Sequence, residues 1–315
     1  MKIAVDLMGG DKAPEVIIEG CSIFLNGGTD SNLHLVGSKI AVEKAKSLSV
    51  LKDCSFDICE DFISMKESMH SFSKNRDETS INRAMKLHKS GVVDAVFSAG
   101  NSGAIIYTAM DILGKLDSSL SPALLTLVPK TDLKYLVLLD IGGSGNRLVE
   151  KDYLLYLAKS GSDFYKYFFD SDSPKVGLLN IGEERYKGTH EHTLAFNELE
   201  SSSLNFSGNI EGDKIFDTDI DVLVTDGFTG NIILKLMESF YDIMTKKFDD
   251  IGVSKLIRNS NYYPKDLKYE NIGGALLLGV DGNVTIGHGK STPRAIASGL
   301  GFAERYYKKT SVEKN

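Results

Sequence analysis

Two stretches of this chain share one pattern: Asp94–Ile106 (DAVFSAGNSGAII) and Asp221–Ile233 (DVLVTDGFTGNII). Both read Asp, three apolar residues, Ser or Thr, any residue, Gly, any residue, Ser or Thr, Gly, any residue and two Ile. The pattern predicts a buried strand, a glycine turn that lets backbone approach a ligand, and the start of a helix whose free N–H groups favour an anion. Two copies predict two walls of one anion site. The alternative is a pair of ordinary strand-to-helix connections.

Further short apolar runs along the chain also end in Gly or Asp, and stretches with helical periodicity lie between most of them. Together with the two copies, the expected strands fall within Lys2–Asp6, Leu33–Gly37, Val92–Gly100, Tyr135–Gly142, Lys175–Gly182 and Asp221–Gly227. This alternation predicts a three-layer α/β/α fold, with a largely parallel sheet and helices on both faces. The polar turns should share the edge at the carboxyl ends of the strands, where such sheets bind ligands.

The chain is long enough for a sizeable core, since it has 315 residues of which 42% are hydrophobic. No stretch of low complexity and no Pro-rich or Gly/Ser-rich linker divides it. We therefore expect a single α/β enzyme domain over residues 1–315, in which any internal boundary would fall near residue 150.

Bulk composition excludes several classes of protein. A net charge of −7 argues against a general nucleic-acid binder, which needs a concentrated cationic face. Cys21, Cys54 and Cys59 cannot all pair with one another, which favours a reducing compartment. The first apolar run is broken by Asp6, and later runs are too short to cross a bilayer. We expect a cytoplasmic protein.

The opening turn also carries candidate binding groups. Gly9 and Gly10 follow the first strand and would expose backbone donors, while Asp6 and Asp11 would hold the turn or orient a polar substrate group. For Asp11 a plain capping role is the alternative. Pro14 is placed to begin a helix at Glu15.

Nucleotide binding is poorly supported, because neither glycine turn matches a Walker A sequence and the opening lacks G-x-G-x-x-G spacing. Inorganic phosphate or a phosphorylated group fits better. Lys235 lies about one turn into the second expected helix, where its ammonium would add a positive charge to that site. A solvent-facing helix lysine is the alternative.

Several motifs in series resemble the PlsX-type phosphate acyltransferases along nearly the whole chain. They are DLMGGDKAPE (6–15), SAGNSGA (98–104), LLNIGEE (178–184), GNIEG (208–212), TDGFTGNIILK (225–235), GGALLLGVDG (273–282) and HG (288–289). The resemblance implies a fold related to phosphate acetyltransferases and to isocitrate and isopropylmalate dehydrogenases. It also implies transfer of a long-chain acyl group from acyl carrier protein to inorganic phosphate, which begins phospholipid synthesis.

That reaction needs no protein nucleophile, because a positioned and partly desolvated phosphate can attack a thioester carbonyl. None of the cysteines lies in a glycine turn, which argues against an acyl-cysteine intermediate. We expect Lys235, His288 and Asn231 to be catalytic. The expected phosphate- and substrate-binding residues are Asp6, Gly9, Gly10, Asp11, Ser98, Asn101, Ser102, Gly103, Asp226, Thr229 and Gly230.

No cofactor and no metal are expected. His190 and His192 have the spacing of metal ligands, but no third ligand is evident and a solvated loop is the better interpretation. A functional role is favoured for His288, whose flanking glycines leave its ring accessible, with a structural hydrogen bond as the alternative.

The chain departs from the family pattern at several positions. Lys12 stands where Asn or His is common, Ser121 where Arg is typical, and Leu276 replaces a proline. The turn after Asp140 retains that Asp and the first glycine, but its Asn is shifted or lost. In place of the missing arginine, the candidate anion contacts are Lys74, Arg76 and Lys130.

The resemblance further implies a homodimer and a protruding helical hairpin, here at about 237–271. Apolar residues and cations alternate in this segment, so it is expected to contact a second copy, acyl carrier protein or the inner face of the membrane. An ordinary helix pair with a solvated face is the alternative. Two rival functions remain open, a phosphate acetyltransferase-like enzyme that uses acyl-coenzyme A and a non-catalytic scaffold that binds acyl carrier protein.

Overall fold

The computed structural model describes residues 1–67, 78–144, 152–250 and 272–311, which belong to two compact units. Unit 1 comprises Met1–Pro122 and Glu270–Asn315, and unit 2 comprises Ala123–Tyr269. The divisions therefore fall at 122/123 and 269/270, not near residue 150. The chain passes from one unit to the other at these two points, and no change of composition marks either of them. The expectation of a single enzyme domain stays a prediction.

Unit 1 contains six strands in the order β3-β2-β1-β4-β11-β10. Their bounds are β1 Lys2–Asp6, β2 Asn32–Gly37, β3 Ser55–Ile58, β4 Ala95–Ser98, β10 Ala275–Leu278 and β11 Val284–Ile286. Neighbours run parallel except β10 and β11, which are antiparallel. Parallel pairing places the ends of β1, β4 and β11 at one edge of the sheet.

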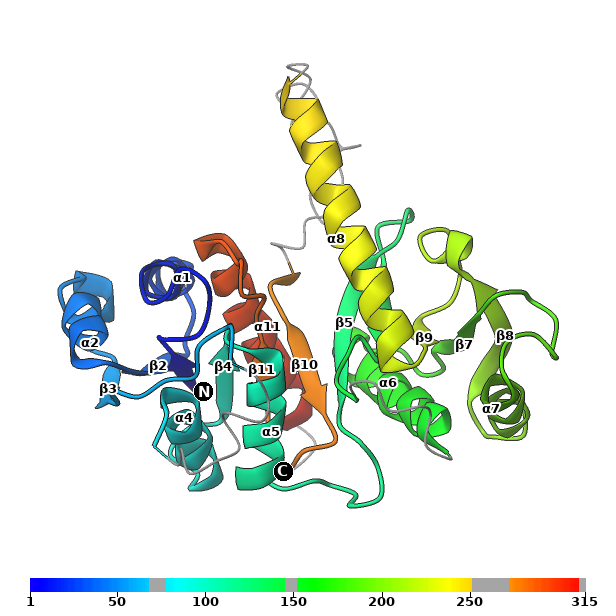
Figure 1. Ribbon diagram of the computed structural model, residues 1–315, viewed down its shortest axis with the longest axis horizontal. Coiled ribbons are helices and arrows are strands. Elements are labelled where there is room, and N and C mark those ends of the chain that lie inside the picture. The colour runs from blue at the N-terminus through cyan, green and yellow to red at the C-terminus, as the bar shows by residue number, and fades with distance from the viewer. Residues whose placement is uncertain (68–77, 145–151, 251–271, 312–315) are drawn as a thin grey trace. The chain divides into compact units, whose positions relative to one another are not determined.

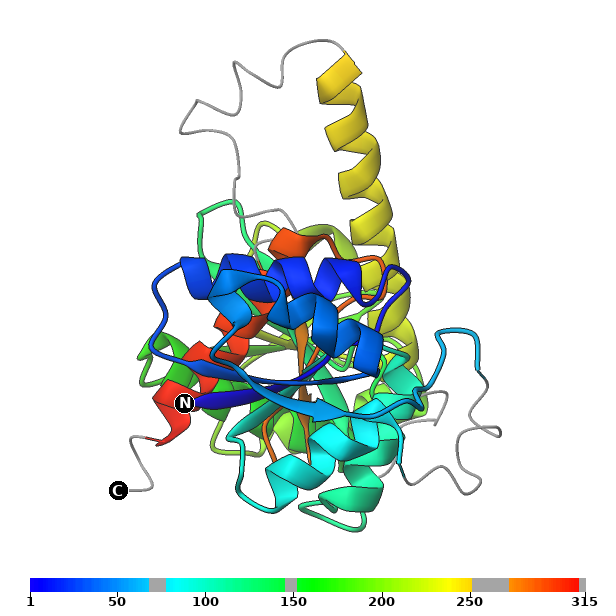
Figure 2. The ribbon, with the colours of Figure 1, turned by 90° about the vertical axis from the view of Figure 1, so that its left-hand side faces the viewer.

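Helices cover both faces of the unit 1 sheet, with α1, α2 and α11 on one face and α4 and α5 on the other (Figures 1 and 2). Their bounds are α1 Glu15–Asn26, α2 Lys39–Lys46, α4 Ser80–Lys89, α5 Ser102–Ile112 and α11 Pro293–Ser311, with a 3₁₀ turn η1 at Ser49–Leu51. Alternate residues of the central strand, Ile3 and Val5, are buried against α1 and α11. Helix α1 begins at Glu15, directly after Pro14, as expected from the sequence.

Close contact between α1 and α11 depends on a glycine. A Cβ atom at Gly20 would lie 2.4 Å from the Cβ of Ile296, so no larger residue fits without moving a helix. Side chains of both helices belong to the unit 1 core.

Unit 2 contains five strands in the order β5-β6-β9-β7-β8. Their bounds are β5 Ala123–Pro129, β6 Tyr135–Leu139, β7 Lys175–Asn180, β8 Asn205–Glu211 and β9 Val222–Val224. Only β5 is antiparallel to its neighbour in this unit. The helices are α6 Tyr153–Phe169, α7 His190–Glu200, the 3₁₀ turn η2 Gly212–Lys214 and α8 Gly227–Asp250. Helix α8 is about 36 Å long, at 1.5 Å per residue.

The predicted fold class is confirmed, because the sheet is largely parallel in both units and is covered by helices. All six strands expected from the sequence are present. Five strands were not expected, namely β3, β5, β8, β10 and β11. Three of these are only three or four residues long, and β8 is rich in polar residues and Gly, so periodicity gives little signal. No helix in the described ranges is long and apolar enough to span a membrane.

Candidate active site

Three polar turns of unit 1 are bonded to one another at the carboxyl edge of its sheet. They follow β1, β4 and β11, and two backbone hydrogen bonds tie them together. The Asp11 amide donates to Gly289 O at 2.8 Å, and the Gly287 amide donates to Ser98 O at 2.8 Å. Within unit 1 the turns therefore share one edge, as the sequence predicted.

A buried carboxylate and a buried hydroxyl join the first two turns. Ser98 Oγ donates to Asp6 Oδ2 at 2.8 Å and accepts the Gly100 amide at 3.1 Å. Met8 donates its amide to Asp6 Oδ1 at 3.0 Å. Burial is the main cause that raises the pKa of Asp6 above its ordinary value of 3.8, and the hydrogen bonds oppose it. Ser98 is fully buried, and both hydrogen bonds of its hydroxyl are made within these turns, so the hydroxyl holds them together.

Gly9 is required by close backbone approach and Gly10 by its backbone conformation. A Cβ atom at Gly9 would lie 2.6 Å from Ser98 Oγ and 2.7 Å from the Gly100 nitrogen. Gly10 has a φ of +123°, which residues other than glycine rarely adopt. The two glycines thus bring the β1 turn directly against the β4 turn.

The first turn of α5 offers open backbone donors. Asn101 caps this helix by accepting the Ala104 amide at 3.2 Å, and its Nδ2 donates to Met65 O at 3.3 Å and to Glu67 O at 3.1 Å. Asn101 is therefore engaged within the protein. In the described part of the chain, the amides of Ser102 and Gly103 have no hydrogen-bond partner, and Ser102 is exposed. These two amides are the anion donors that the helix start provides.

His288 lies in the turn after β11, beside the Gly9–Gly10 turn. Its Nδ1 accepts the Lys290 amide at 3.2 Å, and its carbonyl accepts the Ser291 amide at 2.9 Å. In the neutral ring this arrangement places the proton on Nε2.

The second copy of the repeated pattern lies in unit 2 and is capped differently. Asp226 Oδ1 accepts the amides of Phe228 and Thr229 at 3.0 and 2.9 Å, and its Oδ2 accepts Thr229 Oγ1 at 2.6 Å. The matching position of the first copy is Ala99, which has no acceptor side chain, so α5 begins two positions later in the pattern than α8. An internal carboxylate therefore occupies the donors that we predicted for phosphate at α8.

Further along α8 the predicted residues lie as follows. A Cβ atom at Gly230 would lie 1.9 Å from Asp140 O, so only glycine fits there. Asn231 is exposed and lies beside Gly142, and Lys235 is half exposed and forms an ion pair with Glu238 at 2.8 Å. The expectation that the two copies form one anion site stays a prediction.

The turn after β6 is organised by Asp140, which the sequence analysis placed in a turn but not among the site residues. Its Oδ1 accepts the amides of Leu124, Gly142 and Gly143, and its Oδ2 accepts the Ser144 amide and Tyr153 Oη. The sequence signal was the Asp at a strand end before two glycines, which marks a turn but not its partners.

Other candidate groups lie away from these turns. Lys130 lies at the opposite end of β6 from Asp140, where its ammonium donates to Ile220 O at 3.0 Å, so it does not replace the missing arginine. Lys74 and Arg76 lie outside the described residues. His192 Nδ1 is 2.9 Å from Thr189 Oγ1 in the capping box of α7. Within the described ranges, no group of three or more His, Cys, Asp or Glu side chains could hold a metal ion.

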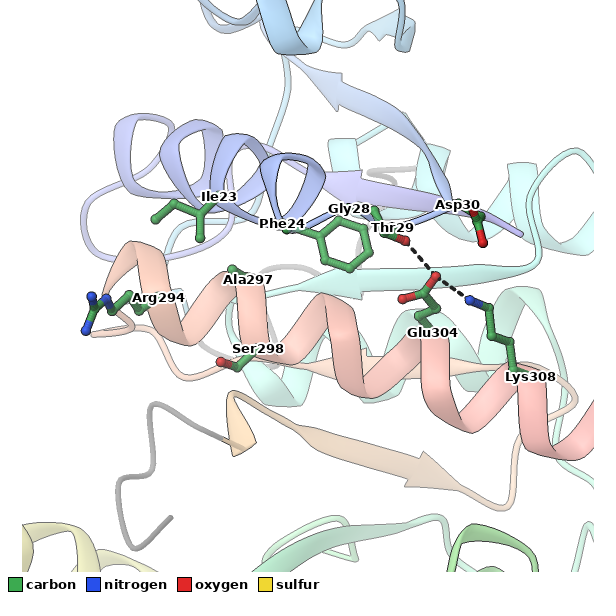
Figure 3. Close-up of a pocket in the computed structure, with 11 residues that line it drawn as sticks. Ile23, Phe24, Gly28, Thr29, Asp30, Arg294, Ala297, Ser298, Glu304 and Lys308 are labelled. Carbon is green, nitrogen blue, oxygen red and sulfur yellow. Dashed lines mark hydrogen bonds and ion pairs between the residues drawn. The ribbon is translucent and has the colours of Figure 1, made fainter. Parts of the chain in front are cut away.

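A hollow of about 570 Å³ lies along α1 and α11 of unit 1 (Figure 3). Arg294 and Lys308 line it, and Glu304 accepts Thr29 Oγ1 at 2.6 Å and Lys308 Nζ at 2.9 Å on its wall. None of its eleven lining residues is a predicted site residue. None of its lining residues belongs to the three bonded turns, so the hollow is separate from them.

The comparison with known proteins agrees with the motifs. A family model described as "Fatty acid synthesis protein" matches residues 1–314. The phosphate acyltransferase of Thermodesulfovibrio yellowstonii is 39% identical over 98% of this chain and 91% of that protein. The chain belongs to the phosphate acyltransferase family. The phosphate acyltransferase of Wolinella succinogenes is 37% identical, over 95% of this chain and 92% of that protein.

Solved structures outside the family share the fold of this phosphate acyltransferase family member. A branched-chain phosphotransacylase from Enterococcus faecalis aligns with a TM-score of 0.60 at 12% identity, over 98% of this chain and 99% of that one. A phosphotransacetylase from Streptococcus pyogenes aligns with a TM-score of 0.58 at 16% identity, over 99% and 94%. At such identities the likeness establishes the architecture alone.

Proposed function

We propose that this acyltransferase moves a long-chain acyl group from acyl carrier protein to inorganic phosphate and so supplies acyl phosphate for phospholipid synthesis. Family membership over nearly the whole chain supports acyl transfer to phosphate. The first turn of α5 is the feature that supports a free anion as the acyl acceptor. There, the amides of Ser102 and Gly103 are open within the described residues, next to the glycine turn that follows β1.

In the proposed reaction a phosphate oxygen bonds to the thioester carbonyl carbon, and the carbon–sulfur bond breaks. The electron pair leaves with the sulfur, and the proton of the monohydrogen phosphate ends on that sulfur, so the products are acyl phosphate and the free thiol of the carrier. Ser102 and Gly103 hold the phosphate through their amides. His288 stabilises the leaving sulfur or the oxyanion through its Nε2 proton.

Residues of α8 enter this proposal as predicted catalytic groups. Lys235 would exchange its ion pair with Glu238 for the phosphate, and its own side chain is half exposed. Asn231 would donate its amide hydrogens to the developing oxyanion. Asp6, Ser98, Asn101, Asp226 and Thr229 support the reaction by fixing the turns, because their side-chain groups are bonded within the protein.

The direct test is product formation with purified protein. Long-chain acyl carrier protein and phosphate are mixed with the protein, acyl phosphate is trapped with hydroxylamine, and the freed carrier thiol is measured. We expect both products in equal amounts, with acetyl-coenzyme A a poor donor. Preference for acetyl-coenzyme A would favour the acetyltransferase-like alternative. Carrier binding without phosphate-dependent thiol release would favour a scaffold.

Ser102 allows a sharper test of the phosphate position. We further propose that the Ser102 hydroxyl is a third donor to the phosphate. Ser102→Ala removes this donor and leaves both amides, so we expect the KM for phosphate to rise by about threefold to tenfold, with the KM for the acyl donor unchanged. Ser118→Ala, which changes an exposed serine in the loop after α5, is the matched control. An unchanged KM for phosphate in Ser102→Ala would show that the Ser102 hydroxyl does not contact the phosphate.

A partner surface is proposed on α8. Phe228, Ile232, Leu236, Phe240 and Ile243 are all more than half exposed and recur along one side of this helix. Their spacing suits contact with a second copy of the chain in a homodimer, or with an anionic membrane surface. The remainder of the predicted hairpin, residues 251–271, lies outside the described residues. Light scattering reports the homodimer and liposome flotation reports membrane contact, each compared between Leu236→Asp and wild type. A wild-type protein that is monomeric and does not float would refute both contacts. We further propose a cytoplasmic location, with the inner face of the membrane as the peripheral site.

A further inference from the structure

Asp140 is a buried carboxylate surrounded by donors. The residue is fully buried, and its two oxygens accept hydrogen bonds from the amides of Leu124, Gly142, Gly143 and Ser144 at 2.7–2.9 Å and from Tyr153 Oη at 3.1 Å. Among the described residues no Lys, Arg or His forms a salt bridge with it. A buried charge without a counter-charge is stable only where its hydrogen bonds are satisfied, and these donors meet that need.

The turn that Asp140 organises lies directly against the start of α8. A Cβ atom at Gly227 would be 2.6 Å from Asp140 Oδ2, and one at Gly230 would be 1.9 Å from Asp140 O. A Cβ atom at Gly142 would lie 3.5 Å from the Cβ of Asn231. At Gly227 and Gly230 there is no room for a methyl group between the turn and the helix, so a shift of the turn must shift the first turn of α8.

We propose that Asp140 is a positioning residue for acyl transfer, which acts by holding the turn 140–144 and through it the placement of Asn231. The proposal rests on the proposed function, in which Asn231 faces the reacting carbonyl. Asp140 itself is closed to substrate because it is fully buried and both of its oxygens are engaged. Its charge matters because hydrogen bonds to an ionised acceptor are about twice as strong as neutral ones.

The substitution Asp140→Asn separates charge from shape. One oxygen remains for three of the amides, but an NH₂ group replaces the oxygen that accepts the Ser144 amide, so two donors face each other. Asp221→Asn is the matched control. Asp221 Oδ2 accepts the Lys175 amide at 2.9 Å and the side chain also bonds to Tyr165, at the opposite end of β9 from α8.

Turnover is measured well below the thermal midpoint of each variant. We expect kcat to fall about tenfold or more in Asp140→Asn and less than about twofold in Asp221→Asn. If Asp140 acts through Asn231, the same substitution in an Asn231→Ala background should lower kcat by less than about twofold. An undiminished effect in that background, or an unchanged kcat in folded Asp140→Asn, would overturn the proposal.

A second measurement does not require activity and so separates this proposal from the proposed function. Amide hydrogen exchange of residues 227–231 should be faster in Asp140→Asn than in wild type and unchanged in Asp221→Asn. Equal exchange in Asp140→Asn and wild type would also overturn the positioning role. If the wild-type protein forms no acyl phosphate, the proposed function is refuted, while the exchange measurement still tests the effect of Asp140 on α8. If Asp140→Asn does not fold, Tyr153→Phe removes only one donor and should show the same changes at smaller size.

Discussion

Gly9→Ala should disrupt the contact between the β1 and β4 turns. The added Cβ atom would meet Ser98 Oγ at 2.6 Å, the Gly100 nitrogen at 2.7 Å and Asp6 Oδ2 at 2.9 Å, whereas ordinary contacts begin near 3.4 Å. The nearest backbone atom must therefore move by about 0.7 Å. Such a movement strains the turn and separates Ser98 from Asp6.

The expected cost follows from these two effects. Overpacking of this kind costs about 1–3 kcal/mol, and loss of the buried hydrogen bond from Ser98 to Asp6 costs about 1–3 kcal/mol. Together they should lower the thermal midpoint by about 10 °C in a unit of this size. Gly100→Ala is the matched control, because its Cβ would lie 3.1 Å from Ser98 Oγ and 3.4 Å from Gly9 Cα. It should lose less than half as much.

The assay combines thermal unfolding with turnover. Gly9→Ala should lose turnover more than tenfold even at temperatures where it is folded, because the displaced turn carries the proposed phosphate site. A midpoint within about 2 °C of wild type, together with normal turnover, would show that the two turns do not approach as closely as described. Equal losses in Gly9→Ala and Gly100→Ala would refute the ranking that the distances predict.

Three further predictions concern other positions. Gly301→Ala, in open space within α11, should stabilise the protein by about 0.5–1 kcal/mol in urea unfolding, and a loss would contradict the described environment. Burial raises the folded-state pKa of Asp6 above 3.8, so the contribution of Asp6 to stability is full below that pH and falls as pH rises through the folded-state pKa. The stability of Asp6→Asn relative to wild type should therefore increase with pH, and a constant difference would argue against a raised pKa. Iodoacetamide near neutral pH should leave turnover intact, since burial raises the pKa of Cys21, Cys54 and Cys59, and rapid inactivation would reopen a cysteine mechanism.

The catalytic assignments on α8 show how far residue type alone can predict a site. Lys235 has the right charge and the right place in its helix, yet Glu238, one turn further on, binds its ammonium. Asp226 and Thr229 lie in a glycine turn that suits an anion, but the carboxylate of Asp226 already caps the helix. A motif identifies which segments approach the site. Hydrogen bonds and ion pairs within the protein decide which side chains remain open to a ligand.

Local sequence determined the strands that precede the polar turns and the start of α1 after Pro14, because strand patterns, proline and glycine act on their immediate neighbours. The series of motifs determined the family. It also determined that Gly9 and Gly10 form a turn next to β1. Tertiary structure alone decided what the polar residues do. Ser98 bonds to Asp6, which is 92 positions away, and Asn101 bonds to Met65, 36 positions away, so no local pattern could have revealed either partner. The same holds for Asp140, whose role depends on how the turn after β6 packs against the first turn of α8.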